Sequence, residues 1–442
     1  MNFKVQLTAS ITSAKHQILL CDKTSNYGSY LPKEDIVLAK AAFDNKQKVY
    51  QTLGGGKSVT VVMLDSTREL FLLKEDSRRA AFNVSKFLNT NRSTEAAFEN
   101  LTDNKELGYA FIEGTILSSY QFLKYKTKEV KANSFIKLAV ANSSLSKAEL
   151  QELEIVCEAN FIARDLINEP LSYLTAVQLS KEIVKVGKEA GFDVEVLNKK
   201  KIEALKMGGL LAVNRGSQLP PTFNVLEYKP TKAKNKKPIV LVGKGVVYDT
   251  GGLSLKLTPH SMDMMKCDMS GAATVIGTLY AIAMMKLPLH VIGLIPATDN
   301  RPGEDAYVPG DVVAMMNGMN VEVLNTDAEG RMILADALHY AENYKPELVC
   351  DFATLTGAAK AAVAGIATVY MGTAAEEVKK KMEASSKNVH ERLVEFPLWE
   401  QYAELIKSDV ADIKNVGGPE AGAITAGKFL ECFVTALGYI SI

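Results

Sequence analysis

The chain has 442 residues, which is more than one ordinary hydrophobic core accommodates and indicates two or three domains. Its 51 basic residues balance 51 acidic ones, so the net charge of zero provides no overall field to hold nucleic acid or an anionic membrane. Small or neutral ligands are therefore the expected partners.

The cysteines and the apolar segments indicate where the protein resides. Cysteine occurs at five widely spaced positions without any CxxC pair, namely Cys21, Cys157, Cys267, Cys350 and Cys432. An odd number of isolated cysteines fits free thiols in a reducing compartment, so we expect a cytoplasmic protein. Residues 1–21 alternate like a strand and lack the basic start and apolar core of a signal peptide. The most apolar window, residues 278–297, is interrupted by Lys286, Pro288 and His290, which indicates buried structure and no membrane span.

The first part of the chain, residues 1–143, predicts an α/β domain without a catalytic cluster. Strand-like runs such as residues 59–64 and 135–140 alternate there with amphipathic helical stretches. Residues 54–58 resemble the end of a phosphate-binding loop, but Gln51 occupies the position of that motif's first glycine. A glycine turn between two strands is the expected structure.

A helix is expected to connect this domain to the rest of the chain. Residues 145–167 have helical periodicity, and Pro170 follows closely, where proline stops helix propagation. The next elements are expected to be a helix, a strand, a second helix and a glycine turn, at residues 176–191, 193–197, 202–207 and 208–209.

Three continuous apolar runs predict strands that are buried on both faces of a parallel sheet. They lie at residues 238–242, 290–295 and 348–352, and helical stretches at 271–285 and 331–344 separate them. This βαβ pattern predicts an α/β protein of two domains. The N-terminal domain is the smaller one, and the larger C-terminal domain has a mainly parallel central sheet flanked by helices.

Polar residues follow the first of these strands, where open α/β sheets place their functional loops. Gly243 and Gly245 suggest a dinucleotide-binding turn, but the third glycine is missing and Asp249 stands where a helix should begin. Taken singly, Lys244 and Asp249 are ordinary solvated loop residues, and Asp268 is an ordinary helix cap.

The stretch from Asn325 to Arg331 places two carboxylates and a guanidinium just ahead of an apolar, helix-forming run. The simplest interpretation is a helix cap with one ion pair. A different interpretation follows if its carboxylates share one pocket with those of the earlier loops, because four carboxylates stay ionised together only beside cations of about four charges in total. That set comprises Asp249, Asp268, Asp327 and Glu329.

Two divalent metal ions would supply this charge. An oxygen-rich set with one nitrogen donor favours Mn²⁺, Zn²⁺, Co²⁺ or Mg²⁺, and no histidine pair forms an HExxH motif. If Lys244 is the nitrogen donor, it must bind as the neutral amine, with its pKa lowered by the metals.

These motifs resemble the leucyl aminopeptidase family of dizinc or dimanganese peptidases, also called cytosol aminopeptidases. The resemblance extends over residues 163–430 and rests on Asn168-Glu169-Pro170, on residues 242–245 with 249–252, and above all on residues 325–331. It implies an N-terminal α/β domain at residues 1–145, a connecting helix at 146–168 and a catalytic peptidase domain at 169–442. The N-terminal domain resembles a macro domain only loosely.

The resemblance also implies a role for each site residue. Asp249 and Glu329 would bridge the metals, Lys244 and Asp268 would complete one metal site, and Asp327 would complete the other. Lys256 would stabilise the oxyanion, and Arg331 would position a bicarbonate ion. The residues matching the family's positions around the substrate's first side chain and the bicarbonate are Met265, Asn325, Thr354, Leu355 and Gly357.

The implied activity is the removal of N-terminal leucine and similar residues from peptides by a water that two metal ions activate. A homohexamer with active sites facing a shared interior is implied as well. In the family a further strand that carries a His and an Asp follows the last helix. Residues 436–442 are expected to lack this strand, so that the sheet edge and one pocket wall would be missing. One alternative is a catalytically impaired family member that acts as a DNA-binding or scaffold protein, and another is a structurally compromised, inactive variant. The net charge of zero argues against DNA binding.

Overall fold

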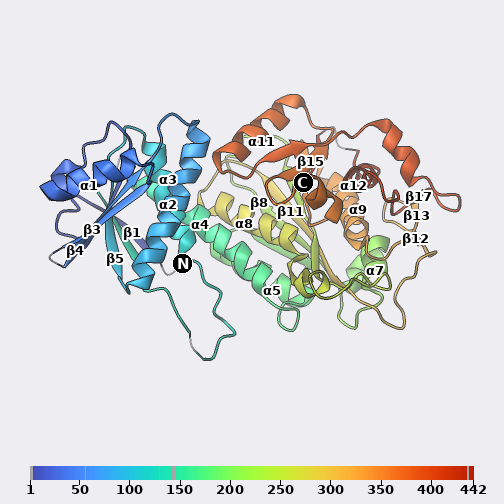
Figure 1. Ribbon diagram of the computed structural model, residues 1–442. Coiled ribbons are helices and arrows are strands. Elements are labelled where there is room, and N and C mark those ends of the chain that lie inside the picture. Colours follow the sequence, from blue (N-terminus) through green and yellow to red (C-terminus); the bar gives the residue numbers. More distant parts are fainter. Residues whose placement is uncertain (1–2, 55, 129, 142–144, 436–437) are drawn as a thin grey trace. The chain divides into compact units, whose positions relative to one another are not determined.

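A computed structural model describes residues 3–54, 56–128, 130–141, 145–435 and 438–442 (Figure 1). The chain divides into two compact units, Met1–Phe161 with Lys387–His390 and Ile162–Ser386 with Glu391–Ile442. The division falls inside helix α4 (Lys147–Asn168). The domain boundaries expected from the sequence stay a prediction.

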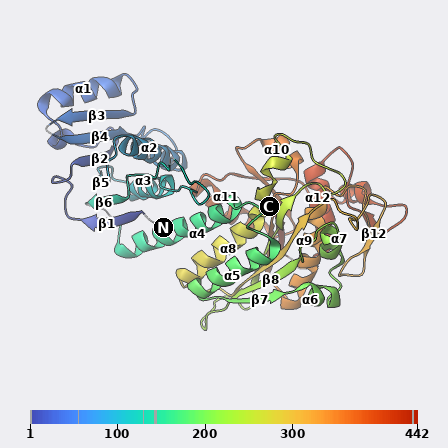
Figure 2. The same cartoon turned by 90° about the horizontal axis from the view of Figure 1, so that it is seen from below.

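The N-terminal unit is built on a six-stranded sheet. Its strands lie side by side in the order β1-β6-β5-β2-β4-β3, as Figure 2 shows. Neighbouring strands are parallel except for β3, which pairs antiparallel with β4. The elements are β1 (Lys4–Thr8), β2 (His16–Cys21), η1 (Gly28–Tyr30), α1 (Lys33–Asp44), β3 (Val49–Gly54), β4 (Lys57–Met63), α2 (Leu70–Thr90), β5 (Glu95–Asn100), α3 (Lys105–Ser118), β6 (Lys137–Ala141) and the first part of α4.

Strand residues of this unit alternate between two cores, because successive side chains of a strand point to opposite faces. Ile18 and Leu20 of β2 pack in the cluster that contains residues of α2, α3 and α4. Leu19 and Cys21 pack in the opposite cluster, together with Ala39 of α1. Helices thus cover both faces of the sheet, as expected of an α/β domain.

The glycine turn expected near residues 54–58 joins two strands. Gly54 at the end of β3 pairs with Lys57 at the start of β4 in an antiparallel hairpin. Gly55 lies outside the described residues. The hairpin excludes a phosphate-binding loop at this position, since no helix follows Lys57.

The C-terminal unit is built on a nine-stranded, mainly parallel sheet, which confirms the predicted fold class. Its order is β16-β15-β18-β14-β9-β11-β8-β7, with β10 pairing to β11. The antiparallel pairs are β11 with β8, β7 with β8 and β15 with β18. The strands are β7 (Asp193–Leu197), β8 (Thr222–Tyr228), β9 (Ile239–Gly243), β10 (Gly245–Asp249), β11 (Val291–Asn300), β14 (Leu348–Phe352), β15 (Thr368–Gly372), β16 (Leu393–Glu395) and β18 (Tyr439–Ser441), and a small sheet joins β12 (Val312–Ala314), β13 (Asn320–Glu322) and β17 (Ile413–Lys414).

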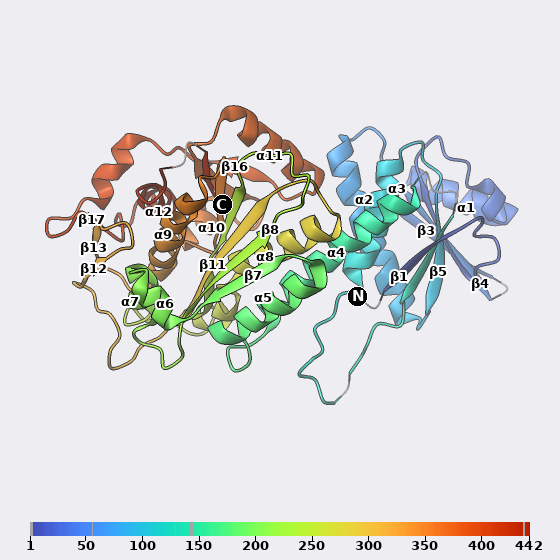
Figure 3. The ribbon, with the colours of Figure 1, turned by 180° about the vertical axis from the view of Figure 1, so that it is seen from behind.

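Helices cover both faces of this sheet. Figure 3 shows α5 and α8 on one side of strands β8 and β11, and α7, α9 and α12 on the other side. Val240 and Val242 of β9 pack in the core with α7, α9 and α12, because alternate strand residues share a face. The helices are α5 (Ala176–Ala190), α6 (Lys199–Ala204), α7 (Gly208–Asn214), α8 (Ser270–Met284), α9 (Glu329–Ala341), α10 (Gly357–Val363), α11 (Glu376–Asn388) and α12 (Gly422–Glu431), with the 3-10 turns η2 (Met262–Cys267), η3 (Glu342–Tyr344) and η4 (Glu400–Ile406).

The three apolar runs of the sequence form the strands β9, β11 and β14, which are adjacent in the sheet. One local prediction is wrong: Gly208 and Gly209 do not form a turn but open helix α7. The carboxylate of Asp336 accepts a hydrogen bond from Leu210 N at 2.9 Å, so a residue far along the chain satisfies a free N–H group of the first helical turn.

The prediction that the last residues contribute no strand to the sheet is also wrong, although the His and Asp of the family's strand are absent from the sequence here. Residues Tyr439–Ser441 form strand β18, which lies parallel to β14 and antiparallel to β15 inside the sheet. Asp351 of β14 accepts hydrogen bonds from Tyr439 Oη at 2.7 Å and Ser441 Oγ at 3.0 Å. This wall of the sheet is therefore formed in the structure. Residues 436 and 437 lie outside the described part of the chain.

Among the described residues, one helical segment, Met262–Met284, is long and apolar enough to cross a membrane by length and composition. Of its most apolar window, 61% is buried inside the structure. Core helices pass the same test, and α8 contributes Val275, Ile276 and Leu279 to the interior.

Candidate active site

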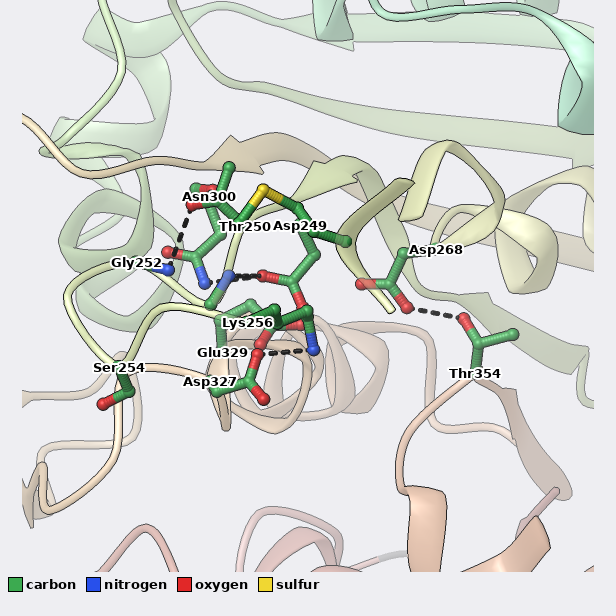
Figure 4. Close-up of polar contacts among 12 residues, drawn as sticks. Asp249, Thr250, Gly252, Ser254, Lys256, Asp268, Asn300, Asp327, Glu329 and Thr354 are labelled. Atoms are coloured by element: carbon green, nitrogen blue, oxygen red, sulfur yellow. Dashed lines mark hydrogen bonds and ion pairs between the residues drawn. The ribbon is translucent and has the colours of Figure 1, made fainter. Parts of the chain in front are cut away.

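Chain segments from the ends of several strands converge on one cavity of about 430 Å³. Lys244 follows β9, Asp249 ends β10 and Thr354 follows β14. Asp268 enters the cavity from the turn between η2 and α8, and Glu329 enters as the first residue of α9. Figure 4 shows the side chains of Asp249, Asp268, Glu329 and Thr354.

Lys244 lies at the centre of the acidic cluster and is only 2% exposed. Its Nζ atom lies 2.8 Å from Asp268 Oδ2 and 2.9 Å from Glu329 Oε1, and it donates to Thr354 O at 3.0 Å. The absence of a side chain at Gly330 makes this position possible, since a Cβ there would lie 2.5 Å from Lys244 Cε. Burial alone would lower the pKa of Lys244, but the surrounding carboxylates raise it above its ordinary value.

Asp249 is 2% exposed and its two carboxylate oxygens have different partners. Oδ1 accepts hydrogen bonds from Gly251 N and from Asn300 Nδ2, each at 2.8 Å. Oδ2 lies 2.8 Å from Lys256 Nζ. Gly251 adopts a φ of +85°, a backbone conformation that favours glycine, and this turn directs its N–H toward Asp249.

Lys256 links two loops of the cluster. Besides Asp249, its Nζ atom contacts Asp327 Oδ1 at 2.5 Å. Burial would lower the pKa of Lys256, but Asp249 and Asp327 together raise it. Burial raises the pKa of Asp327 to about 6, although the hydrogen bond from Lys256 opposes this rise. The contacts hold Lys256 as a charged ammonium group between the two carboxylates.

Asp268 and Glu329 lie on the other side of Lys244. Asp268 Oδ1 accepts hydrogen bonds from Thr354 Oγ1 and from Lys244 Nζ, each at 2.8 Å, whereas the buried Oδ2 has only the ion pair with Lys244. Burial raises the pKa of Asp268 well above its ordinary value, against the effect of Lys244, and Glu329 raises it further. Glu329 is 1% exposed at the N-terminus of α9, where the helix dipole favours a carboxylate.

The donor set fits divalent cations. One carboxylate oxygen each from Asp249, Asp268 and Glu329 lies within 4.8 Å of the others, and all three residues are buried. The cluster of four carboxylates and two ammonium groups keeps two negative charges uncompensated when all six are ionised. Buried charge of this kind needs a counter-charge, and carboxylate oxygens suit hard or borderline metal ions.

All but two of the residues that the sequence singled out line the cavity, including Met265, Leu355 and Gly357. Its remaining walls come from α10, β15 and α12, and from Ser441 and Ile442 at the end of the chain. The pocket wall that the sequence reasoning expected to be missing is therefore present.

Arg331 and Asn325 lie outside the cavity lining. Arg331 is buried on α9 and donates from Nη1 to Asn415 O at 2.7 Å, and it has no ion-pair partner among the residues that the structure describes. Burial lowers the pKa of Arg331 to about 10, and Glu329 opposes this effect. Asn325 Oδ1 accepts a hydrogen bond from Asp327 N at 2.8 Å, so it orients the loop that carries Asp327.

Sequence reasoning missed three residues that support the cluster. Asn300 donates to Asp249, Tyr307 donates from Oη to Thr326 O at 2.9 Å, and Asn415 contacts Arg331. A signal existed for Asn300, since it follows the second apolar run in a polar Thr-Asp-Asn segment at the carboxyl end of a buried strand. No local pattern marks Tyr307 or Asn415.

The sequence is similar to that of known proteins of one family. Residues 161–442 match the model of the cytosol aminopeptidase family, catalytic domain. A protein named "Probable cytosol aminopeptidase" from Chlorobaculum tepidum is 44% identical over 386 residues, which cover 81% of this chain and 75% of the relative. A protein of the same name from Chlorobaculum parvum is 51% identical over 281 residues, 63% of this chain and 55% of the relative.

The whole fold also matches a solved structure. A mutant of tomato leucine aminopeptidase superposes with a TM-score of 0.88 at 25% identity, covering 99% of this chain and 91% of that chain. The fold and the matches together define a peptidase, that is, a hydrolase of peptide bonds. More particularly, the chain belongs to the cytosol aminopeptidase family.

Proposed function

We propose that the cavity around Asp249, Asp268 and Glu329 binds two divalent metal ions, manganese or zinc, and hydrolyses N-terminal residues from peptides. The observation that carries this proposal is the convergence of these three buried carboxylates, each with an oxygen within 4.8 Å of the others. Lys244 and Asp327 would complete the ligand set that Asp249, Asp268 and Glu329 begin. Bound metal ions would acidify a water for attack and polarise the carbonyl of the scissile bond.

Lys256 is the proposed oxyanion-stabilising residue. Its ammonium group lines the cavity beside Asp249 and Asp327. A fixed positive charge in a partly buried site stabilises negative charge that develops on a substrate oxygen.

Arg331 is proposed to hold a bicarbonate ion that moves protons from the attacking water. Its buried guanidinium has no carboxylate partner among the described residues, which leaves its charge available to a small anion. Asn415 O fixes one end of the guanidinium through Nη1.

The apolar part of the cavity is proposed to hold the side chain of the substrate's first residue. Met265, Leu355 and Met371 line the cavity, together with Thr354 and Gly357. Flexible methionine side chains adapt to unbranched and branched apolar groups, so leucine and methionine are the preferred residues.

A cytoplasmic homohexamer is the proposed working form. Relatives carry the name cytosol aminopeptidase, which supports the location, and the neighbouring structure is a leucine aminopeptidase. Light scattering coupled to size-exclusion chromatography would test the hexamer. The comparisons give no support to the alternative of a DNA-binding or scaffold protein.

Hydrolysis of leucine p-nitroanilide tests the proposed site. We expect activity that requires Mn²⁺ or Zn²⁺ and disappears in Asp249→Ala and in Glu329→Ala. Asp263→Ala is the matched control, because Asp263 is an exposed carboxylate on η2 close to Asp268 in the chain. Full activity of the Asp249→Ala, Glu329→Ala double variant would refute the site.

A further inference from the structure

Asn300, the last residue of β11, joins two loops of the acidic cluster. Its side chain is fully buried, with 0% exposure. The Nδ2 atom donates to Asp249 Oδ1 at 2.8 Å and to Thr326 O at 3.0 Å. One amide nitrogen therefore links Asp249, at the end of β10, to the loop that precedes α9. Figure 4 shows the contact with Asp249.

The backbone of Asn300 reinforces this link. Its carbonyl oxygen accepts hydrogen bonds from Thr250 N at 3.1 Å and from Thr250 Oγ1 at 2.8 Å. Packing around the amide is close, because a Cβ on Gly252 would lie 2.9 Å from Asn300 Oδ1. Side chain and backbone together fix two consecutive residues of the loop, Asp249 and Thr250.

The two loops are tied to each other on the far side of Asn300 as well. Thr326 Oγ1 donates to Gly251 O at 2.7 Å and accepts from Ser254 N at 2.8 Å. Thr326 directly precedes Asp327, so its position sets the distance between Asp327 and Asp249. The side chain of Asn300 contacts a carboxylate oxygen of the cluster, whereas Thr326 Oγ1 bonds to backbone atoms.

The contact with Asp249 has a directional consequence. With Asn300 Nδ2 and Gly251 N both bonded to Oδ1, the plane of the carboxylate is fixed and Oδ2 faces Lys256 inside the cavity. Outer partners that orient ligand side chains tune a metal site without touching the metal. A neutral amide donor suits this place, since a second carboxylate would repel Asp249.

We propose that Asn300 is a positioning residue of the metal centre: it holds the carboxylate of Asp249 in its ligating orientation and sets the spacing between the loops of Asp249 and Asp327. This inference rests on the proposed function. It assigns Asn300 an effect on metal affinity and on the number of ions bound, beyond its contribution to folding.

Asn224 on β8 is a matched control for Asn300. It has 0% exposure in the same sheet, and its Oδ1 atom lacks a hydrogen bond, as does that of Asn300. Its Nδ2 atom donates to Ile295 O at 3.1 Å and to Thr222 Oγ1 at 3.4 Å, with no carboxylate of the cluster among its partners. A purely structural role would make the two asparagines equivalent.

The experiment compares Asn300→Ala, Asn300→Ser and Asn224→Ala with the full-length parent chain. Equilibrium dialysis against Mn²⁺ and Zn²⁺ gives the number of ions bound and their dissociation constants, and thermal unfolding with and without metal gives fold stability. We expect Asn300→Ala to weaken metal binding about 10- to 100-fold. Asn300→Ser, which keeps a donor on a shorter side chain, should fall between this variant and the parent, and it carries the test if the alanine variant does not fold.

Asn224→Ala should lose thermal stability while its metal dissociation constants stay within about twofold of the parent. Parental metal affinity in both Asn300 variants would overturn the inference and leave the proposed function intact. An equal loss of affinity in Asn224→Ala would overturn it too, because the effect would then follow from general destabilisation. A parent chain that binds no metal, or an Asp249→Ala variant that binds as well as the parent, would refute the proposed function itself.

Discussion

Lys256 Nζ lies 2.8 Å from Asp249 Oδ2, and the same atom contacts Asp327 at 2.5 Å. This ammonium group is therefore held between two proposed metal ligands without being one itself. Lys256→Met keeps most of the side-chain volume and removes the charge. We expect kcat for leucine p-nitroanilide to fall about 100- to 1000-fold, the cost of removing one oxyanion-stabilising group. Metal affinity should not fall, since a competing cation is removed, and an unchanged kcat would exclude the proposed role.

Removal of the metal ions should lower both activity and stability. Chelation leaves three buried carboxylates and the half-buried Asp327 with two lysines as their counter-charges. We expect reversible loss of activity in EDTA and a lower melting temperature, since a ligand at 100 times its dissociation constant stabilises the fold by about 2.7 kcal/mol. Calorimetry with EDTA and after readdition of Mn²⁺ measures both effects. Activity that persists in metal-free protein would contradict the proposal.

Asp351 should make stability depend on pH. It is fully buried and accepts hydrogen bonds from the hydroxyl groups of Tyr439 and Ser441. Burial raises the pKa of Asp351 to about 7. Because the folded pKa exceeds the unfolded one, the protonated carboxyl contributes stability at low pH, and this contribution is lost as pH rises through about 7.

Asp351→Asn tests this dependence, because an amide stays neutral and can donate to either hydroxyl. Asp351 should make the unfolding free energy of the parent decline between pH 4 and pH 7, and this contribution should be absent in the variant. A difference of one between the folded and unfolded pKa corresponds to about 1.4 kcal/mol. Urea titrations at pH 5 and pH 8 measure the difference. Parallel pH profiles for parent and variant would show that Asp351 does not titrate in this range.

Asp336 should be sensitive to the same substitution for a different reason. Its Oδ2 accepts from Leu210 N at 2.9 Å and its Oδ1 from Met316 N at 3.0 Å, so both oxygens serve backbone N–H groups. The NH₂ group of an asparagine at this position would face one of these two backbone N–H groups, so that two donors would oppose each other. Asp336→Asn should therefore destabilise the fold by about 1–3 kcal/mol, the cost of one unsatisfied buried donor. A melting temperature equal to that of the parent would contradict this.

Lys360 should tune the preference for charged substrates. It lies on α10, lines the cavity and has no ion-pair partner among the described residues. Its side chain is exposed, so the effect is modest. Lys360→Glu should lower kcat/KM for glutamyl p-nitroanilide relative to the leucyl substrate by up to about fivefold, which corresponds to an exposed charge pair. Lys380→Glu, on an exposed part of α11 outside the cavity, should leave the ratio unchanged.

The sequence by itself determined the parallel sheet and most of the cluster. The runs that form β9, β11 and β14 are mostly apolar, because strands buried on both faces expose no side to water. The candidate ligands stand in short polar segments that follow or precede regular elements. Taken singly, these segments predict only loop residues and helix caps, and the resemblance to the cytosol aminopeptidase family was needed to assign them as ligands. The glycine hairpin between β3 and β4 followed from local pattern alone.

Only the tertiary structure decided the contacts between residues far apart in the chain. Asn300 meets Asp249 across 51 positions, and Asp336 caps α7 across 126 positions, which converts an expected glycine turn into a helix. Strand β18 forms because β14 and β15 offer it backbone partners, and no periodicity in residues 438–442 reveals those partners. Periodic patterns record which face of an element is buried, whereas the partner of a buried polar group depends on how distant segments come together.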